Sequence, residues 1–380
     1  MNLTRLIRPR HIIKCFRYWF SDQVAGNSVL IKEKSILLIK TEAIGDYVLF
    51  RNFIQSIKQS NRFKNYTITL AGNEIWKPLA LKYDRDAVDH FIFIDKNKFS
   101  NVSAYRKSKL QEINSSGYEF VINVTFSREF LMGDSIVKCT KAFNKIGMQG
   151  DSVSEIPFFK WIGNFFYTSR IQLSKQYFFE FDRNKQFFEQ ITGNAIDFAA
   201  PHFPDQKTRK PLAILLPGAQ ARYRRWSPLK FKEIAEFLNN KYGFNILICG
   251  GKEDFEAGEL ISGTQNNNYI QNRCGMDSLD LLPELLAEAA IVICNDSGTL
   301  HLAAALNTPA VCISNANHYG RFTPYPAEWN KPLRFVYPPS FLKKYKSEKK
   351  RIQAVKYGSD YAIDEINTED VASHIKVLLA

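Results

Sequence analysis

Three short segments of the sequence carry side chains whose types and spacing could act on a charged substrate. The first ends in Gly45-Asp46, shortly after Lys40-Thr41-Glu42. A carboxylate at the start of a helix can take a proton from a hydroxyl group, although aspartate is also one of the best helix caps. Because glycine lets the backbone approach a ligand closely, we interpret Asp46 as a candidate general base, with Gly45 and Thr41 beside it.

The second segment, residues 216–228, contains Gly218 and three arginines, Arg222, Arg224 and Arg225. Arginine presents a planar fork of hydrogen-bond donors that matches phosphate oxygens. The ordinary alternative is an exposed charged surface. Because the segment directly follows an apolar run, we favour the binding of a diphosphate.

The third segment, residues 294–305, also follows an apolar run. Its polar residues are Asp296, Ser297, Gly298, Thr299 and His301. The three residues after the aspartate place backbone N–H groups at a predicted helix start, which favours a bound anion. A lone histidine is more often structural than functional, but the position of this one beside a polar loop favours contact with a ligand.

Short apolar runs precede these segments and recur along the chain. Amphipathic stretches of helix length separate the runs, and this alternation is typical of parallel strands covered on both faces. The predicted strands are residues 35–39, 66–70, 91–94, 120–124, 212–216, 244–249, 291–294 and 310–313. Because the pattern occurs twice, the sequence predicts an α/β protein with two doubly wound, Rossmann-like domains.

A polar, proline-containing stretch at residues 199–207 separates the two halves and is interpreted as a linker. Open α/β sheets bind ligands at the carboxyl ends of their strands, so two such domains would face a central cleft. The predicted organisation is an N-terminal arm (1–30), an N-terminal domain (31–200), a C-terminal domain (201–355) and a C-terminal helix that packs back on the N-terminal domain (356–380).

The composition is basic, with a net charge of +13 over 380 residues, of which 45% are hydrophobic. The hydrophobic fraction is normal for a folded protein. The charge favours an anionic partner, which could be nucleic acid, a membrane surface or a phosphorylated substrate. No two of the six cysteines have the C-x-x-C spacing of a zinc site. We therefore expect no metal site and a reducing, cytoplasmic compartment.

The first twenty residues combine basic with aromatic and aliphatic residues and contain no acid. They lack the uninterrupted apolar core and the cleavage site of a signal peptide, and no run of eighteen apolar residues occurs that would predict a membrane span. After Pro9 the segment can form a basic amphipathic helix that lies on an anionic leaflet. The alternative is a solvated or packed arm.

Three further features carry weaker signals. Residues 157–190 are dense in aromatic residues, which we interpret as packing between the domains, with a wall of the acceptor site in contact with lipid as the alternative. Residues 343–351 form a charge block that includes Lys343 and Lys344 and could hold a phosphorylated substrate instead of being only solvated. Asp84-Arg85-Asp86 has the D-x-D form of a metal site but lies in a polar loop, so we do not interpret it as one.

Taken together and in order, the three segments resemble glycosyltransferase family 9, the ADP-heptose:lipopolysaccharide heptosyltransferases. The matching stretches are residues 36–48 for the first motif, 217–219 with 224–228 for the second, 296–305 for the third and 366–371 for the closing helix. The resemblance extends over residues 34–380.

The resemblance implies the GT-B architecture, with an acceptor domain first and a nucleotide-sugar domain second. It implies inversion at the anomeric carbon, with Asp46 as the general base. The acceptor-side residues are expected to be Thr41, Gly45, Lys343 and Lys344. The donor-binding residues are expected to be Gly218, Arg224, Arg225, Glu253, Asp254, Asp296, Ser297, Gly298, Thr299 and His301. The sequence departs from the family pattern at Arg224, where lysine is frequent, and at Glu42, where small residues are frequent.

The expected function is transfer of a sugar, heptose from ADP-heptose by resemblance, to a lipopolysaccharide-core or related glycan, without a cofactor or metal. The expected location is the cytoplasm, with peripheral binding to the inner face of a bacterial cytoplasmic membrane. The alternatives are a transferase that uses another nucleotide sugar, a nucleotide-sugar epimerase, and a basic protein that binds nucleic acid. No motif of the common nucleic-acid modules occurs, so nucleic acid is not an expected partner.

Overall fold

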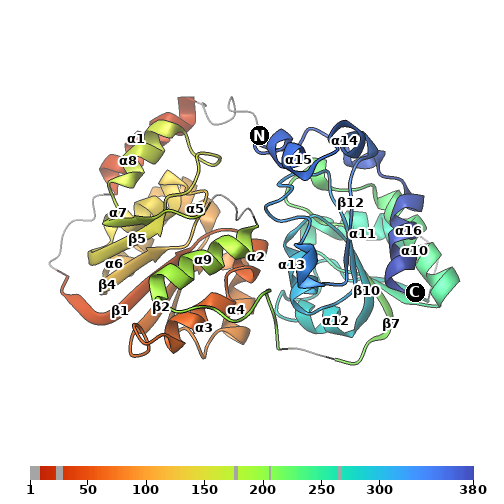
Figure 1. Cartoon of the computed structure of the whole chain (residues 1–380), viewed down its shortest axis with the longest axis horizontal. Helices are drawn as coiled ribbons and strands as arrows, with labels where there is room; N and C mark the ends of the chain where they lie inside the picture. Colours follow the sequence, from red (N-terminus) through yellow and green to blue (C-terminus); the bar gives the residue numbers. More distant parts are fainter. Residues whose placement is uncertain (1–8, 23–28, 175–178, 205–206, 264–267) are drawn as a thin grey trace. The chain divides into compact units, whose positions relative to one another are not determined.

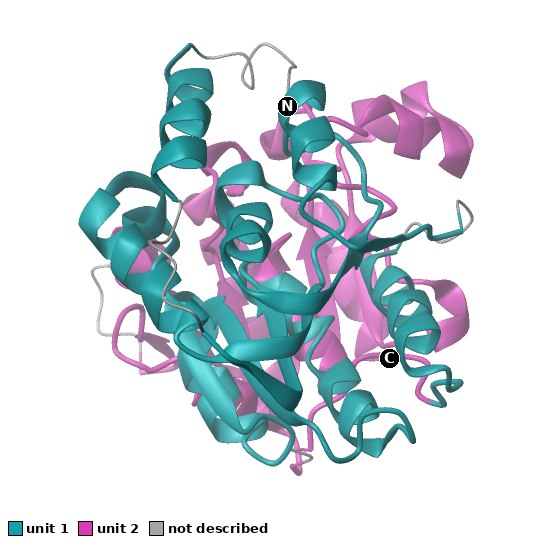
Figure 2. Cartoon of the chain, turned by 90° about the vertical axis from the view of Figure 1, so that its left-hand side faces the viewer, with its two compact units in different colours: residues 1–197 teal, residues 198–380 magenta. Residues whose placement is uncertain are grey.

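The computed structural model describes residues 9–22, 29–174, 179–204, 207–263 and 268–380. It divides the chain into two compact units, Met1–Asp197 and Phe198–Ala380 (Figure 2). The division falls beside the polar stretch that we interpret as a linker. Each unit has its own parallel sheet with helices around it (Figure 1). No helix among the described residues combines the length and the apolar character needed to cross a membrane.

The first unit is built on a six-stranded parallel sheet in the order β3-β2-β1-β4-β5-β6. The strands are β1 (Ile31–Lys40), β2 (Thr67–Asn73), β3 (His90–Ile94), β4 (Gly117–Asn123), β5 (Ala142–Met148) and β6 (Ser169–Ile171). The α-helices are α1 (Pro9–Ser21), α2 (Ile44–Val48), α3 (Asn52–Gln59), α4 (Lys77–Tyr83), α5 (Lys96–Asn101), α6 (Ser103–Asn114), α7 (Ser135–Cys139), α8 (Pro157–Asn164) and α9 (Glu180–Thr192). The second half of β1 is fully buried, as expected for a central strand covered on both faces.

The second unit has a six-stranded parallel sheet in the order β12-β11-β10-β7-β8-β9. The strands are β7 (Lys210–Leu216), β8 (Asn245–Ile248), β9 (Ile270–Asn272), β10 (Ala289–Asn295), β11 (Ala310–Ile313) and β12 (Leu333–Val336). The α-helices are α10 (Pro228–Tyr242), α11 (Phe255–Ser262), α12 (Leu282–Glu288), α13 (Gly298–Ala305), α14 (Pro339–Lys344), α15 (Glu348–Ala354) and α16 (Thr368–Leu378). The core of this unit lies between the apolar strands and α10, α11 and α16.

Both sheets are wound in the same way. The chain starts at a central strand, fills one side of the sheet, and then returns to the centre to fill the other side. This is the Rossmann order. It creates a switch point between two adjacent central strands, because the connections that follow them go to opposite sides of the sheet. The switch points lie between β1 and β4 in the first unit and between β7 and β10 in the second. The predicted α/β class with two Rossmann-like domains is therefore confirmed.

The C-terminal helix differs from its prediction. Residues 356–380 were expected to pack back on the N-terminal domain, but α16 contacts α10, β11 and β12 of the second unit. Val371 and Ile375 are fully buried in the core of that unit. The apolar face of α16 covers the sheet of the second unit beside α10, and its side chains are therefore buried in that core.

The helix expected after Pro9 is present as α1, and it is packed into the first unit. Cys15 and Tyr18 are buried against Phe159 and Ile162 of α8. The N-terminal segment is thus a packed element where it is described, and this favours the packed alternative over a solvated arm.

A buried ion pair ties the end of α1 to α6. Asp22 accepts hydrogen bonds from Arg106 Nε at 2.8 Å and Nη2 at 2.5 Å. The guanidinium group also lies 4.5 Å from the ring centre of Tyr18 and 4.4 Å from that of Phe99. Both charged side chains are almost completely buried, so each depends on the other for compensation of its charge.

Candidate functional site

The loop between β1 and α2 carries the candidate base and is held by its neighbours. Asp46 lies in the first turn of α2. The side-chain amide of Asn73 donates hydrogen bonds to the carbonyl oxygens of Thr41 at 3.3 Å and Glu42 at 3.1 Å. The indole N–H of Trp76 donates to the same carbonyl of Glu42 at 3.2 Å. These bonds fix the loop and therefore the start of α2.

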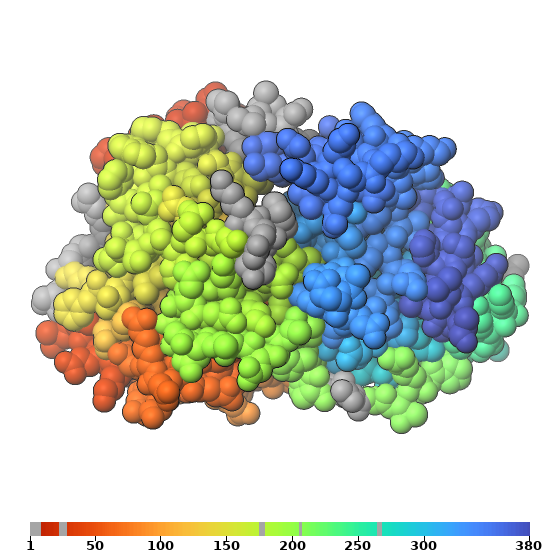
Figure 3. Space-filling view, in the orientation of Figure 1, coloured from red at the N-terminus to blue at the C-terminus, as the bar shows by residue number. Residues whose placement is uncertain are grey.

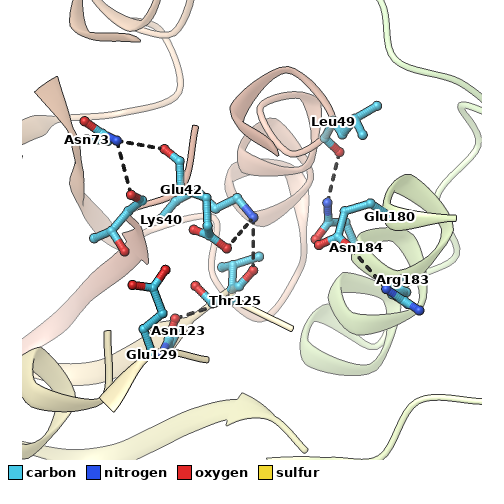
Figure 4. Close-up of polar contacts among 12 residues, drawn as sticks. Lys40, Glu42, Leu49, Asn73, Asn123, Thr125, Glu129, Glu180, Arg183 and Asn184 are labelled. Carbon is cyan, nitrogen blue, oxygen red and sulfur yellow. Dashed lines mark hydrogen bonds and ion pairs between the residues drawn. The ribbon is translucent and has the colours of Figure 1, made fainter. Parts of the chain in front are cut away.

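A buried lysine brings positive charge to this loop. Lys40 Nζ lies 3.2 Å from Glu42 Oε1 and 3.3 Å from the carbonyl oxygen of Val124 (Figure 4). Burial by itself lowers the pKa of Lys40, but the charges of Glu42, Asp46 and Glu180 raise it overall. The ammonium group is therefore kept protonated among carboxylates.

A second lysine reaches the same group of carboxylates from the end of β3. Lys96 Nζ lies 2.7 Å from Glu129 Oε1. Burial lowers the pKa of Lys96, whereas Glu129, Glu42 and Asp46 raise it overall. Asp46 consequently lies in the field of two ammonium groups, at the switch point of the first sheet.

Helix α9 adds further polar groups to this region (Figure 4). Glu180 is buried and pairs with Arg183, with 3.3 Å between Oε2 and Nη1. Among the described residues, Glu42 Oε2 and Thr125 Oγ1 are buried without a hydrogen-bond partner. Both atoms can accept a hydrogen bond from a hydroxyl group, so the region fits a hydroxyl-bearing ligand.

The D-x-D sequence does not form part of this site. Asp84 is buried, its Oδ1 lies 2.7 Å from Arg51 Nη2, and its Oδ2 accepts a hydrogen bond from the Tyr47 hydroxyl. Burial raises the pKa of Asp84, although Arg51 and Tyr47 act in the opposite direction. Asp86 is exposed. The two aspartates therefore have separate environments, and Asp84 links α2 to the end of α4.

We expect Asp84→Ala to lower the free energy of unfolding by about 3 kcal/mol, because it leaves the guanidinium group of Arg51 buried without its carboxylate. Urea unfolding followed by circular dichroism measures this loss. The matched control is Asp86→Ala, which should change the free energy by less than about 0.5 kcal/mol. If both substitutions lowered the free energy of unfolding equally, and only in the presence of added divalent metal, the two aspartates would bind a metal ion together.

In the second unit, Asn295 joins the two loops that meet at the switch point. It is the last residue of β10 and is fully buried. Its side-chain amide donates to the carbonyl oxygen of Pro217 at 2.6 Å, and its Oδ1 accepts from the backbone N–H of Trp226 at 3.1 Å. The second and third sequence segments are thereby held side by side.

Arg224 and Asp296 form an ion pair across the same switch point. Arg224 Nη2 lies 3.2 Å from Asp296 Oδ1 and also donates to the carbonyl oxygen of Asp296. Asp296 Oδ2 accepts from the Ser314 hydroxyl at 2.8 Å. Arg224 Nε is buried and has no hydrogen-bond partner among the described residues. An arginine that is fixed on one edge and retains an unused donor is suited to an anionic ligand.

His301 is buried inside α13 next to this pair. Its Nδ1 lies 2.8 Å from the Tyr325 hydroxyl, and its ring lies 5.9 Å from that of Phe322. Burial and, to a smaller extent, the charge of Arg224 lower the pKa of His301 to about 3. The imidazole is therefore neutral near pH 7, where it can accept or donate a hydrogen bond but adds no positive charge.

The buried neutral His301 makes stability depend on pH. The unfolded chain binds a proton at this histidine below about pH 6.5, whereas the folded chain does not until about pH 3, so stability falls as the pH falls through this window. The loss should be about 1.4 kcal/mol per pH unit, or about 2 kcal/mol between pH 7.5 and 5. Urea unfolding at these two pH values should show this extra loss in the wild type and not in His301→Gln. The control is His90→Gln, at an exposed position, in which the free energy of unfolding should depend on pH as it does in the wild type. If the free energy of unfolding of His301→Gln depended on pH as strongly as that of the wild type, the neutral state of His301 would be contradicted.

Glu253 and Asp254, two of the predicted donor-binding residues, differ in their surroundings. Asp254 is buried, accepts from the backbone N–H of Gly251 at 3.0 Å, and lies 3.4 Å from Arg225 Nη1. Burial raises the pKa of Asp254. A Cβ atom on Gly218 would lie 2.3 Å from Asp254 Oδ2, so the loop after β7 needs a glycine there. Glu253 is exposed.

The remaining predicted donor residues lie at the start of α13. Ser297, Gly298 and Thr299 are half-buried, and the Ser297 and Thr299 hydroxyls lie 2.8 Å apart. The structure thus brings the third segment together with Arg224 at one switch point.

The predicted acceptor-side residues are distributed over both units. Thr41 and Gly45 are buried in the first unit, next to Asp46. Lys343 and Lys344 are exposed at the end of α14 in the second unit.

Sequence reasoning missed three residues that organise these sites, namely Lys96, Asn295 and Ser314. Asn295 could have been noticed, because it is a polar residue at the end of an apolar strand and directly precedes Asp296. Ser314 has the same signal, because it directly follows the apolar run of residues 310–313. The position of Lys96 near Asp46 has no local signal, since only the parallel sheet brings them close.

The described residues include one group of three potential metal ligands that lie close together, His11, Cys15 and Glu155. Glu155 Oε1 accepts from the backbone N–H of Ile156 at 2.9 Å and lies 3.2 Å from His11 Nε2, and Oε2 accepts from the N–H of Phe130 at 3.1 Å. This cluster anchors α1 to the loop before α8.

Comparisons with known proteins agree with these features. The profile of glycosyltransferase family 9 (heptosyltransferase) matches residues 106–333, which is more than half of the chain. Lipopolysaccharide heptosyltransferase 2 of Escherichia coli (strain K12) is 32% identical over 110 residues, which cover 28% of this chain and 31% of that protein. Lipooligosaccharide heptosyltransferase 2 of Campylobacter jejuni is 26% identical over 181 residues, which cover 42% of this chain and 56% of that protein. The chain thus matches only about a third to a half of the length of these relatives.

Solved structures share the fold over almost the whole chain. An E. coli heptosyltransferase WaaC with ADP has a TM-score of 0.69 at 16% identity and covers 90% of this chain and 99% of its own. A family 9 glycosyl transferase from Veillonella parvula DSM 2008 has a TM-score of 0.67 at 19% identity, covering 93% and 99%. These likenesses establish the GT-B fold class. The profile match over more than half of the chain shows that the chain belongs to glycosyltransferase family 9, the heptosyltransferase family.

Proposed function

We propose that this protein is an inverting glycosyltransferase that transfers heptose from ADP-heptose to a lipopolysaccharide-core or related glycan acceptor, without a metal ion. The observation that carries the proposal is the buried Arg224 Nε, a donor without a partner among the described residues, beside Asp296 and the start of α13. A charged donor at the switch point of a Rossmann-like sheet suits the diphosphate of a nucleotide sugar.

Asp46 is proposed as the general base. Its carboxylate takes the proton of the acceptor hydroxyl as that oxygen attacks the anomeric carbon. The nearby ammonium groups of Lys40 and Lys96 favour the charged form of the carboxylate. Glu42 Oε2 and Thr125 Oγ1 are available to hydrogen-bond other hydroxyls of the acceptor sugar.

Negative charge develops on the leaving diphosphate as the glycosidic bond breaks. Arg224 and Arg225, with the backbone N–H groups at the start of α13, are proposed to stabilise this charge. We assign Gly218, His301 and the carboxylates of Glu253 and Asp254 to the rest of the donor site. Thr41, Gly45, Lys343 and Lys344 remain the proposed acceptor-side residues.

The relatives support the choice of substrates. The matched proteins are named heptosyltransferases that act on lipopolysaccharide or lipooligosaccharide, and one solved relative is described with ADP. Membership in family 9 supports the transferase over an epimerase or a nucleic-acid-binding protein. We further propose that the protein acts in the cytoplasm, at the inner face of the cytoplasmic membrane.

Calorimetry without metal tests the donor site by comparing ADP, UDP and GDP. Selective binding of ADP, abolished when Arg224→Ala and Asp296→Ala are combined, is the expected result. Preference for UDP or GDP would retain the transferase and exclude ADP-heptose. Absence of binding by all three nucleotides to folded protein would overturn the proposed function.

A further inference from the structure

The first unit exposes a set of aromatic side chains on two neighbouring helices. This aromatic surface consists of the exposed Phe20, Phe158, Trp161 and Phe165 and the half-buried Phe16 and Trp19. Phe20, Trp161 and Phe165 are 66%, 58% and 70% exposed. Within residues 157–190, Phe159, Phe187 and Phe188 are buried, whereas Phe158, Trp161 and Phe165 are exposed. Large exposed apolar surfaces usually mark a site of interaction.

The six rings form a continuous path from α1 to the end of α8. Successive ring centroids are separated by 5.3 Å (Phe20–Trp19), 6.2 Å (Trp19–Phe16), 6.1 Å (Phe16–Phe158), 6.3 Å (Phe158–Trp161) and 5.0 Å (Trp161–Phe165). The path crosses between the helices at Phe16 and Phe158. The surface is therefore one patch and not several separate exposed residues.

A shared core holds the two helices in place. Cys15 and Tyr18 on the inner face of α1 are buried with Phe159 and Ile162 of α8. The helices lie side by side in Figure 1, and α8 contributes to the molecular surface in Figure 3. The aromatic surface is thus presented by a preformed pair of helices, so little conformational entropy is lost when it binds.

Positive charge accompanies the aromatic side chains. Arg10, Ile13, Arg17 and Phe20 have the spacing of one helical face, and all four are exposed. Lys160 lies on α8 between Phe159 and Trp161, and neither helix contains an acidic residue. Cations and apolar side chains on the same exposed face are typical of helices that lie in the plane of an anionic membrane surface.

We propose that this aromatic surface docks on an anionic lipid bilayer, with the aromatic rings at the boundary between headgroups and acyl chains and the arginines against lipid phosphates. Tryptophan and phenylalanine are suited to that boundary because they combine apolar area with rigid rings. The positive charge of the surface favours an anionic bilayer over a basic or neutral apolar partner. The inference deepens the proposed function, because a glycolipid acceptor would lie in such a bilayer. Only the biological purpose of the docking rests on the proposed function.

The test measures flotation of the full chain with vesicles and uses no sugar donor, so its failure leaves the proposed transfer reaction untouched. Wild type should bind vesicles of phosphatidylglycerol and phosphatidylethanolamine and should not bind phosphatidylcholine vesicles. High salt should weaken the binding. The intrinsic fluorescence should shift to shorter wavelength as Trp161 leaves water.

Two double variants remove the two parts of the surface. Trp161→Ser with Phe165→Ser removes exposed aromatic area, and Arg10→Glu with Arg17→Glu reverses charge. Each should lower the vesicle partition coefficient at least about tenfold. Since all four side chains are exposed, the variants should keep the wild-type circular dichroism and melting temperature.

Matched controls change equally exposed positions of the second unit. Leu229→Ser with Leu260→Ser, 62% and 57% exposed, and Lys241→Glu with Lys356→Glu should bind vesicles as the wild type does. Absence of wild-type binding to anionic vesicles, or equal loss in variants and controls, would overturn the proposal. A wild-type dimer that the Trp161→Ser variant dissociates, without vesicle binding, would also overturn it by showing that a second copy covers the surface.

Discussion

Replacing Asp46 by asparagine is expected to lower kcat for sugar transfer by about 10³-fold while leaving ADP affinity within about twofold of the wild type. The substitution keeps the size and shape of the side chain but replaces one carboxylate oxygen by an amide group, which cannot act as the proposed acceptor of the proton. Asp46 lies in the first unit, whereas Arg224 and Asp296 lie in the second, so donor binding should not respond. Steady-state kinetics with ADP-heptose and a heptose-deficient glycan acceptor, together with calorimetry for ADP, measure both quantities.

The neighbouring carboxylate provides the control for this experiment. Glu42 is 14% exposed and pairs with Lys40 Nζ, and Glu42→Gln keeps its shape. We expect this variant to raise KM for the acceptor more than it lowers kcat, because Glu42 Oε2 is proposed to bind a hydroxyl that does not react. If Glu42→Gln abolishes kcat while Asp46→Asn retains it, the base is Glu42 and our assignment is wrong.

The second large effect is expected at Arg224, where alanine should weaken ADP binding about 100-fold. The substitution removes the guanidinium group that is proposed to donate hydrogen bonds to the phosphates. It also leaves Asp296, which is almost completely buried, without its cation. Calorimetry measures the affinity, and urea unfolding should show an accompanying loss of about 2 kcal/mol in the free energy of unfolding.

Arg224→Lys separates charge from geometry. Lysine restores the charge next to Asp296 but lacks the fork that donates from Nε and Nη2 together. We therefore expect the lysine variant to recover most of the stability and only part of the ADP affinity. Arg334→Ala, at an exposed position of β12, is the matched control and should change neither. Unchanged ADP affinity in folded Arg224→Ala would exclude Arg224 from the donor site.

Most of the strands that the sequence predicted are buried on both faces, whereas β3, which it also predicted, is an edge strand that is only partly buried. β1, β7 and β10 contain continuous apolar runs, and a central parallel strand requires such runs. β5 was missed because polar residues interrupt its sequence, Ala-Phe-Asn-Lys-Ile-Gly-Met. β6 and β9 have only three residues each and lie at sheet edges, so no periodicity can reveal them.

The candidate site shows a similar division. Asp46, Arg224 and Asp296 could be proposed because each follows an apolar run in a short polar segment. The position of Lys96 near Asp46 could not, because it depends on β3 ending beside β2, which in turn pairs with β1. The packing of α16 was mispredicted for a related reason, since an amphipathic pattern shows that a face is buried but not which surface covers it.

The buried pair of Asp22 and Arg106 constrains how the N-terminal segment can be exchanged in evolution. Arg106 is the first residue of the stretch that matches the family profile, whereas Asp22 and α1 precede that stretch. A gene that lost the segment would leave a guanidinium group buried without a carboxylate, at a cost of about 3 kcal/mol. A homologue without α1 should therefore carry a neutral or apolar residue at the position of Arg106, so the two positions should be inherited together.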